Sequence, residues 1–176
     1  MSVQPHPLLV VDDDRANLES IQRTFEREKI PVLTAEDGRA ALDLLRQRRI
    51  GVVLTDLMMP GMDGFEVCRR IKQSASHAHV PVIMVTALDQ PSDKVQGLEN
   101  GADDFLTKPV DDIALITRVK NLARLKMLND EMLMRAATTQ QLGLPPSAAM
   151  ARAMRGESGR ILLVDDHRRS AARTMQ

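Results

Sequence analysis

Short, continuous apolar runs alternate in this sequence with longer stretches in which apolar residues recur every three or four positions. A continuous apolar run predicts a strand that is buried on both faces, as strands in a parallel sheet are. Recurrence every three or four positions predicts an amphipathic helix that covers such a sheet. The alternation extends over residues 7–126 and predicts an α/β fold, a doubly wound five-stranded parallel sheet with helices on both faces.

The predicted strands and helices follow one another in strict alternation. We expect strands at residues 8–11, 31–35, 51–55, 81–85 and 102–107. We expect helices at residues 14–29, 40–48, 64–73 and about 91–100, and a last helix from residue 110 onward. Because the carboxyl ends of parallel strands lie along one edge of the sheet, side chains that follow different strands are expected to converge there.

The last helix is expected to be unusually long. Its apolar periodicity continues to about Arg135, so the helix should extend beyond the body of the domain. Leucines on this helix are mixed with Asn129 and several methionines, which fits interdomain packing or a homodimer contact, and the sequence leaves both open. The apolar residues that carry the pattern are Leu115, Leu122, Leu125, Leu128, Met132 and Leu133.

Beyond this helix the sequence predicts a linker and the start of a second domain. Residues 136–159 are rich in Ala, Thr, Gln, Ser, Gly and Pro, a composition typical of linkers. The motif ILLVDD at 161–166 then repeats the motif LLVVDD at 8–13. Because residues 160–176 are too few to bury a core, we expect them to be the truncated start of a second, similar domain in a longer protein.

The composition favours no particular macromolecular partner. Lys plus Arg and Asp plus Glu each number 24, so no net charge attracts nucleic acid or an anionic membrane. No apolar run approaches the roughly 20 residues of a membrane span, and residues 1–7 lack the features of a signal peptide. We therefore expect a cytoplasmic protein with no membrane insertion and no direct contact with nucleic acid. The single cysteine, Cys68, is expected to be a buried apolar side chain.

Three acidic side chains follow two of the predicted strands. Asp12 and Asp13 come after the strand at 8–11, and Asp56 comes after the strand at 51–55. Carboxylates crowded at one sheet edge repel each other unless a divalent cation neutralises them, and oxygen ligands favour Mg²⁺. Taken singly, Asp12 and Asp13 fit helix capping better than metal binding, but the company of Asp56 favours a metal site. Asp14 is expected to be the N-cap of the first helix.

Asp56 is also the predicted nucleophile, because a carboxylate can attack phosphorus and form a mixed anhydride. Lys108 follows the strand at 102–107 and Thr86 follows the strand at 81–85, so both are expected to contact the phosphoryl oxygens. Phe105 should lie near the Thr86 hydroxyl. It serves either as plain core packing or as an aromatic switch residue, and the sequence leaves both open.

The motifs VVDDD, TDLMMPGMDG, VTA and FLTKP together resemble the receiver domain of two-component response regulators, over residues 7–126. The resemblance implies the flavodoxin-like (βα)5 receiver fold. It implies that a histidine kinase or phosphotransfer protein donates a phosphoryl group to Asp56. It further implies that Asp13, Asp56 and the backbone carbonyl of Met58 hold Mg²⁺, and that Asp12 acts through a water molecule.

The same resemblance assigns roles on the neighbouring strands. It implies that Lys108 and Thr86 bind the phosphoryl group, that Phe105 is a switch residue, and that the peptide bond before Pro109 is cis. Phosphorylation is then expected to change the surface formed by residues 91–100, residues 102–107 and the last helix. Phenylalanine stands at Phe105 where the family more often has tyrosine, so the switch lacks a phenolic hydrogen bond.

The repeated DD motif, the long last helix and the segment GMDGFEVCRRIK further resemble the first receiver of PleD-type regulators. That resemblance implies a second receiver and an output domain, a diguanylate cyclase, in the full-length protein. The sequence contains no GG-[DE]-EF cyclase signature. We therefore expect this chain to be a signalling receiver that catalyses its own phosphorylation, and not to make a cyclic dinucleotide itself.

Two functions of other classes compete with this hypothesis. A phosphatase with an aspartyl nucleophile needs a second acid two positions later to protonate the leaving group, and Met58 occupies that position. A receiver-like scaffold or adaptor that acts without phosphorylation is the stronger alternative, and failure to bind Mg²⁺ would favour it. A nucleotide-binding module is disfavoured because no Gly-rich loop follows the strand at 8–11.

Overall fold

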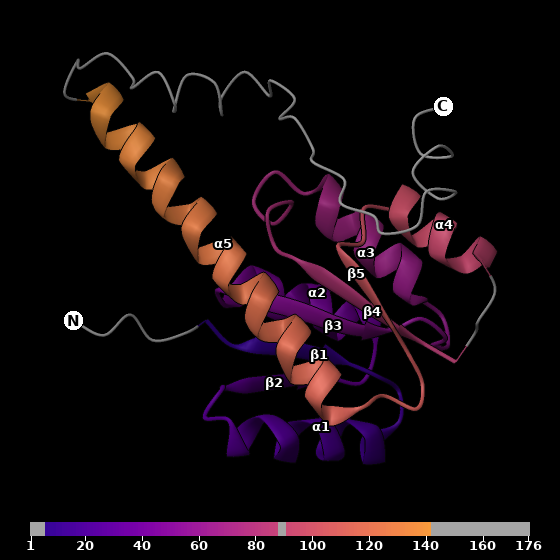
Figure 1. The fold of residues 1–176 in the computed structure, drawn as a ribbon. Coiled ribbons are helices and arrows are strands. Elements are labelled where there is room, and N and C mark those ends of the chain that lie inside the picture. Colours follow the sequence, from indigo (N-terminus) through magenta and orange to yellow (C-terminus); the bar gives the residue numbers. More distant parts are fainter. Residues whose placement is uncertain (1–5, 88–90, 142–176) are drawn as a thin grey trace, which may run out of the picture. The chain divides into compact units, whose positions relative to one another are not determined.

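The computed structural model describes residues 6–87 and 91–141, and its centre is a single parallel sheet (Figure 1). The strands lie in the order β2-β1-β3-β4-β5, and every neighbouring pair is parallel. This is the doubly wound, flavodoxin-like arrangement that the sequence predicted. The strand bounds are β1 (Leu8–Val11), β2 (Val32–Ala35), β3 (Val52–Asp56), β4 (Val82–Thr86) and β5 (Asp104–Thr107).

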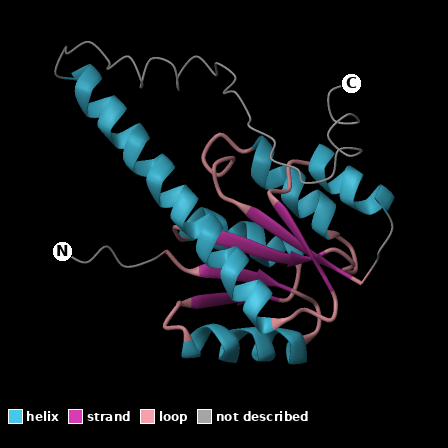
Figure 2. Ribbon diagram, viewed as in Figure 1, coloured by secondary structure: helices cyan, strands magenta, loops and turns pink. Residues whose placement is uncertain are grey.

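A helix follows each strand (Figure 2). Aspartates set the start of the first three helices, because each of their carboxylates accepts a backbone N–H of the first turn. Asp14 caps α1 in this way, Asp37 caps α2 and Asp63 caps α3, each over 2.8 Å. The helix bounds are α1 (Arg15–Arg27), α2 (Gly38–Gln47), α3 (Gly64–Gln73), α4 (Pro91–Glu99) and α5 (Asp112–Gln141).

The strands bury side chains on both faces of the sheet, which is why their sequences are continuously apolar. In β1, Leu9 and Val11 pack with α2 and α3, whereas Leu8 and Val10 pack with α1 and α5. Phe25 of α1 is fully buried on the second face. The two cores hold the sheet rigidly, so the loops at its carboxyl edge project from a fixed frame.

Helix α5 runs to Gln141, whereas the sequence predicted an end near Arg135. The helix continues because residues 136 and 137 are alanines, which favour the helical conformation. The Thr138 hydroxyl donates to the Met134 carbonyl over 3.0 Å within this extension. The chain divides into two compact units at residues 131 and 132, so α5 is shared between them. The predicted second domain and most of the predicted linker lie outside the described residues.

Within the described part of the chain, no helix is long and apolar enough to cross a membrane.

Cys68 lies in the core between α3 and the sheet, as predicted. Its Sγ is 3.4 Å from the backbone carbonyl oxygen of Asn100. Burial raises the pKa of the Cys68 thiol to about 11; the charge of Lys72 lowers this pKa slightly and that of Asp103 raises it slightly. The thiol is therefore protonated and unreactive in the folded domain at neutral pH.

Candidate functional site

The candidate site lies where the strand order reverses between β1 and β3. The connection after β1 leads to β2 on one side, and the next strand, β3, lies on the other. Open α/β sheets form a crevice at such a point, beyond the carboxyl ends of the strands. Asp12 directly follows β1 and Asp56 is the last residue of β3, with Val11 and Thr55 paired between them.

The structure brings Asp12, Asp13 and Asp56 together. One carboxylate oxygen from each residue lies within 4.8 Å of the others. Asp12 and Asp56 are 4% and 9% exposed, whereas Asp13 is open to solvent. Three negative groups at this spacing repel one another when two of them are buried, so a cationic group beside the cluster would relieve the repulsion.

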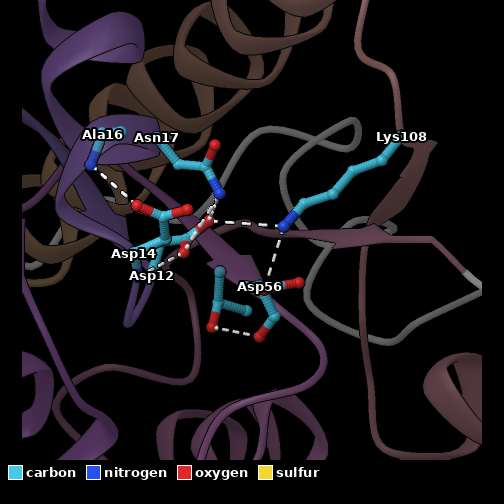
Figure 3. A network of polar contacts seen from close by, with 7 residues as sticks. Asp12, Asp14, Ala16, Asn17, Asp56 and Lys108 are labelled. Atoms are coloured by element: carbon cyan, nitrogen blue, oxygen red, sulfur yellow. Dashed lines mark hydrogen bonds and ion pairs between the residues drawn. The ribbon is translucent and has the colours of Figure 1, made fainter.

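Lys108 supplies one cationic group (Figure 3). Its Nζ is 2.9 Å from Asp56 Oδ2 and 3.4 Å from Asp12 Oδ2. Burial alone would lower the pKa of Lys108, but the hydrogen bond and charge of Asp56, with those of Asp12, outweigh it and raise that pKa. Lys108 is therefore fully charged at neutral pH.

At Asp12, in contrast to Lys108, the effect of burial on the pKa outweighs that of the neighbouring donors. Burial, together with the nearby charge of Asp56, raises the pKa of Asp12. The Asp14 backbone N–H, the Lys108 ammonium and the Asn17 amide act against that increase. A carboxylate whose ionised form is disfavoured in this way gains the most from a bound cation.

The backbone around Asp56 is held in place by three hydrogen bonds. Leu57 N–H donates to the Val85 carbonyl, Gly64 N–H donates to the Leu57 carbonyl, and the Thr55 hydroxyl donates to the Asp56 carbonyl, over 2.9, 2.9 and 3.0 Å. Gly64 makes a close approach here, since a Cβ at this position would overlap the Asp56 carbonyl oxygen and lie 2.9 Å from Leu57 Cα. The turn can therefore close only with glycine at residue 64.

Replacement of Gly64 by alanine is expected to disturb both stability and the site. The added methyl group must displace backbone at Asp56, so the free energy of unfolding should fall by about 1 to 3 kcal/mol. Urea denaturation followed by circular dichroism measures this change. Gly61→Ala in the same loop is the control, because a Cβ at Gly61 meets no atom within 4 Å and strains only a backbone with φ of 78°. A loss of unfolding free energy in Gly64→Ala no larger than that in Gly61→Ala would contradict the role given to Gly64.

Thr86 and Phe105 lie on the last two strands of the sheet. Thr86 ends β4 and is buried, and its carbonyl accepts the backbone N–H of Lys108 over 2.8 Å. Phe105 is half-buried, and its ring packs so closely against Gly97 of α4 that a Cβ at Gly97 would overlap it. The contact couples β5 to α4. Whether Thr86 and Phe105 act as a switch stays a prediction.

Two further predictions concern the residues that follow β5 and β3. The peptide bond between Lys108 and Pro109 is cis, as the resemblance implied. Met58 follows β3 with a side chain that is 63% exposed, and the use of its carbonyl as a metal ligand stays a prediction. A cavity of about 260 Å³ lies beside the cluster, and residues of α1 and α5 line it together with Asp12, Asp56 and Lys108.

Asn17 is a site residue that the sequence reasoning missed. It lies in the first turn of α1, lines the same cavity and donates to the Asp12 carboxylate. A signal existed, because a polar side chain three residues after a helix N-cap points back toward the chain that precedes the helix.

Comparisons with known proteins agree with this geometry. The family model for the response regulator receiver domain matches residues 8–120. The chain belongs to this family. Among curated relatives, it is 45% identical over 166 residues to the response regulator PleD of Caulobacter vibrioides, which covers 94% of this chain and 36% of PleD. It is 40% identical over 121 residues to the heme response regulator HssR of Staphylococcus epidermidis, which covers 69% of this chain and 53% of HssR.

Solved receiver domains share the fold. The receiver domain of the Francisella response regulator 1452 is 36% identical, with a TM-score of 0.63, and the match covers 68% of this receiver chain and 97% of that domain. The chemotaxis response regulator CheY4 of Vibrio cholerae is 29% identical, with a TM-score of 0.63, and the match covers 66% of this chain and 98% of CheY4. The chain spans only about a third to a half of the lengths of PleD and HssR.

Proposed function

We propose that this receiver accepts a phosphoryl group on Asp56 from a histidine kinase or a phosphotransfer protein, with Mg²⁺ bound beside it. The observation that carries the proposal is the contact of Lys108 Nζ with Asp56 Oδ2 over 2.9 Å, within a cluster of three carboxylates. A lysine bound to one carboxylate oxygen leaves the carboxylate placed for attack and is itself placed to meet the incoming phosphoryl oxygens.

The residues present fit Mg²⁺. The cluster offers oxygen atoms only, carries up to three negative charges against one lysine, and has one face open to solvent at Asp13. Asp13, Asp56 and the Met58 carbonyl would hold the ion, and Asp12 would act through a water molecule. When bound, Mg²⁺ neutralises the carboxylates and the phosphoryl oxygens, which lets two anions approach each other.

Phosphoryl transfer forms a bond between an Asp56 carboxylate oxygen and phosphorus and breaks the bond from phosphorus to the donor nitrogen of phosphohistidine. The electron pair of the broken bond stays on the imidazole nitrogen. Lys108 exchanges its contact with Asp56 for a contact with a phosphoryl oxygen, and the raised pKa keeps it charged throughout. The Thr86 hydroxyl donates to a second phosphoryl oxygen.

Phosphorylation adds about −1.5 to −2 charge at the end of β3. Thr86 and Lys108 are drawn toward this charge, and Phe105 turns into the space that Thr86 leaves. Since the Phe105 ring packs against Gly97, its movement changes the surface of α4, β5 and α5. The change is a shift between two populations of one fold. In the full-length protein this surface acts on a second receiver and an output domain, a diguanylate cyclase, with a homodimer as one form of the assembly.

Mg²⁺ dependence tests the proposal directly. Incubation with Mg²⁺ and a small acyl phosphate is expected to add one phosphoryl group per chain, and an excess of chelator is expected to abolish the addition. Intact-mass spectrometry measures both, and it suits a chain without tryptophan or tyrosine. No addition in the presence of Mg²⁺, together with no binding of Mg²⁺, would favour the phosphorylation-independent scaffold instead.

A further inference from the structure

Asn17 is placed by the start of α1. Asp14 caps this helix, so Asn17 lies in the first turn, directly after Ala16. Side chains in a helix tilt toward its N-terminus, which directs Asn17 back toward the end of β1. Its Nδ2 is 3.2 Å from Asp12 Oδ2 and 3.4 Å from Asp12 Oδ1 (Figure 3).

The Asp12 carboxylate is surrounded by donors. Oδ1 accepts the backbone N–H of Asp14 over 2.8 Å, and Oδ2 lies 3.4 Å from Lys108 Nζ. Among the described residues, Asn17 alone is bonded to both oxygens. The three donors together hold the carboxylate in one orientation, and Asn17 is the donor that spans both of its oxygens.

The chemistry of the site determines which end of the amide faces Asp12. An ionised carboxylate only accepts hydrogen bonds, so the NH₂ group must face it, because the amide oxygen would be repelled. Aspartate at residue 17 would add a fourth negative charge, and leucine would fill a similar volume with no donor. An asparagine therefore supplies what this position requires, a short side chain that donates without bringing a charge.

We propose that Asn17 is a positioning residue that holds the Asp12 carboxylate toward Asp13 and Asp56 and thereby sets the affinity of the cluster for a divalent cation. This inference rests on the proposed function, because it assumes that Mg²⁺ binds there. Asn17 does not contact the reacting atoms. Its effect reaches the phosphoryl transfer only through the fraction of protein that carries the ion.

Isothermal titration with Mg²⁺ alone tests the inference on the full chain. Asn17→Leu and Asn17→Ala are each expected to raise the Mg²⁺ dissociation constant about tenfold, the size typical for loss of a group that orients a metal ligand. The control is Gln22→Leu, which removes another amide donor from α1, one bonded to Glu26 over 2.9 Å, away from the cluster. It is expected to leave the constant unchanged. Melting temperatures without Mg²⁺ establish that each variant is folded.

The dependence of the phosphorylation rate on Mg²⁺ concentration distinguishes a role in ion binding from a merely structural role of Asn17. With a small acyl phosphate, the Asn17 variants are expected to be slow at low Mg²⁺ and to approach the wild-type rate at saturating Mg²⁺. A rate that stays low at every Mg²⁺ concentration would overturn the inference, because the defect would then lie outside ion binding.

These experiments distinguish failure of the inference about Asn17 from failure of the proposed function. If the wild-type chain binds no Mg²⁺, the proposed function fails. If the wild-type chain binds Mg²⁺ and Asn17→Leu binds it equally well, only the inference fails, and Asn17 is a space-filling residue. Should the leucine variant not fold, Asn17→Ala decides by the same comparison of dissociation constants and rates.

Discussion

Asp56→Asn is expected to abolish phosphoryl uptake from a small acyl phosphate in the presence of Mg²⁺. The amide of asparagine is not an anionic nucleophile, so no acyl phosphate forms. The substitution keeps the shape of the side chain at the end of β3 and removes one of the three charges that attract the ion. Intact-mass spectrometry should show the unmodified mass at all times at which the wild-type chain is fully labelled. Mg²⁺ should also raise the melting temperature of the variant by less than that of the wild type.

Asp43→Asn is the matched control for this experiment. Asp43 is an exposed residue of α2 that pairs with Arg46 over 2.8 Å and is not a member of the acidic cluster. Its replacement changes the net charge by the same amount and should leave labelling intact. Labelling of Asp56→Asn at the wild-type rate would mean that Asp12 or Asp13 accepts the phosphoryl group, and the nucleophile would have to be reassigned.

Lys108→Met is expected to give the second large effect, a fall of about 10²-fold in the rate of phosphorylation, as for loss of one group that stabilises developing charge. Methionine keeps the length of the side chain and removes the ammonium group. Lys108 Nζ contacts both Asp56 and Asp12, so its loss leaves two buried carboxylates and the phosphoryl oxygens with one cation fewer. The rate is measured from the time course of labelling at saturating Mg²⁺.

Lys120→Met controls for the loss of a lysine. Lys120 is an exposed residue of α5 that pairs with Glu28 over 2.5 Å, and surface ion pairs contribute little. Its rate of labelling should equal that of the wild type. An unchanged rate in Lys108→Met would show that the ammonium serves only to neutralise the carboxylates in the resting protein.

The parts of the fold that the sequence predicted best are those where local and tertiary preferences agree. The strand β1 has the predicted bounds, Leu8 to Val11, because every one of its residues is apolar and both faces of the sheet are covered. Helix α3 also has the predicted bounds, since Asp63 caps its first turn and Gly64 begins it. The sheet order then follows from the right-handed crossovers between parallel strands.

The end of α5 and the start of α2 depend on individual residues, which the average composition of a segment does not reveal. The end of α5 was placed too early because Ala136, Ala137, Gln140 and Gln141 are good helix formers, whereas the glycines and prolines that suggested a linker come only afterwards. Helix α2 begins at Gly38, earlier than predicted, because Asp37 caps it. A cap is set by one side chain and leaves no periodic signal.

For the candidate site, too, some features could be predicted from the sequence and others could not. Asp12, Asp56 and Lys108 could be named from the sequence because each directly follows or ends a strand, and parallel strands bring such positions to one edge. Their distances, and the bonding of Asn17 to both oxygens of Asp12, depend on how α1 turns back over the sheet. That geometry is a tertiary property, so the sequence could indicate the chemistry of the site but not how its carboxylates are oriented.

The buried thiol of Cys68 can report how often this domain opens locally. This thiol lies on the buried face of α3 and is protonated at neutral pH, so an alkylating reagent can reach it only when that region opens transiently. The pace of alkylation then measures how often the opening occurs. Phosphorylation that tightens the packing around β4 and α4 should slow this pace, and a single mass increment on one sulfur atom would record it.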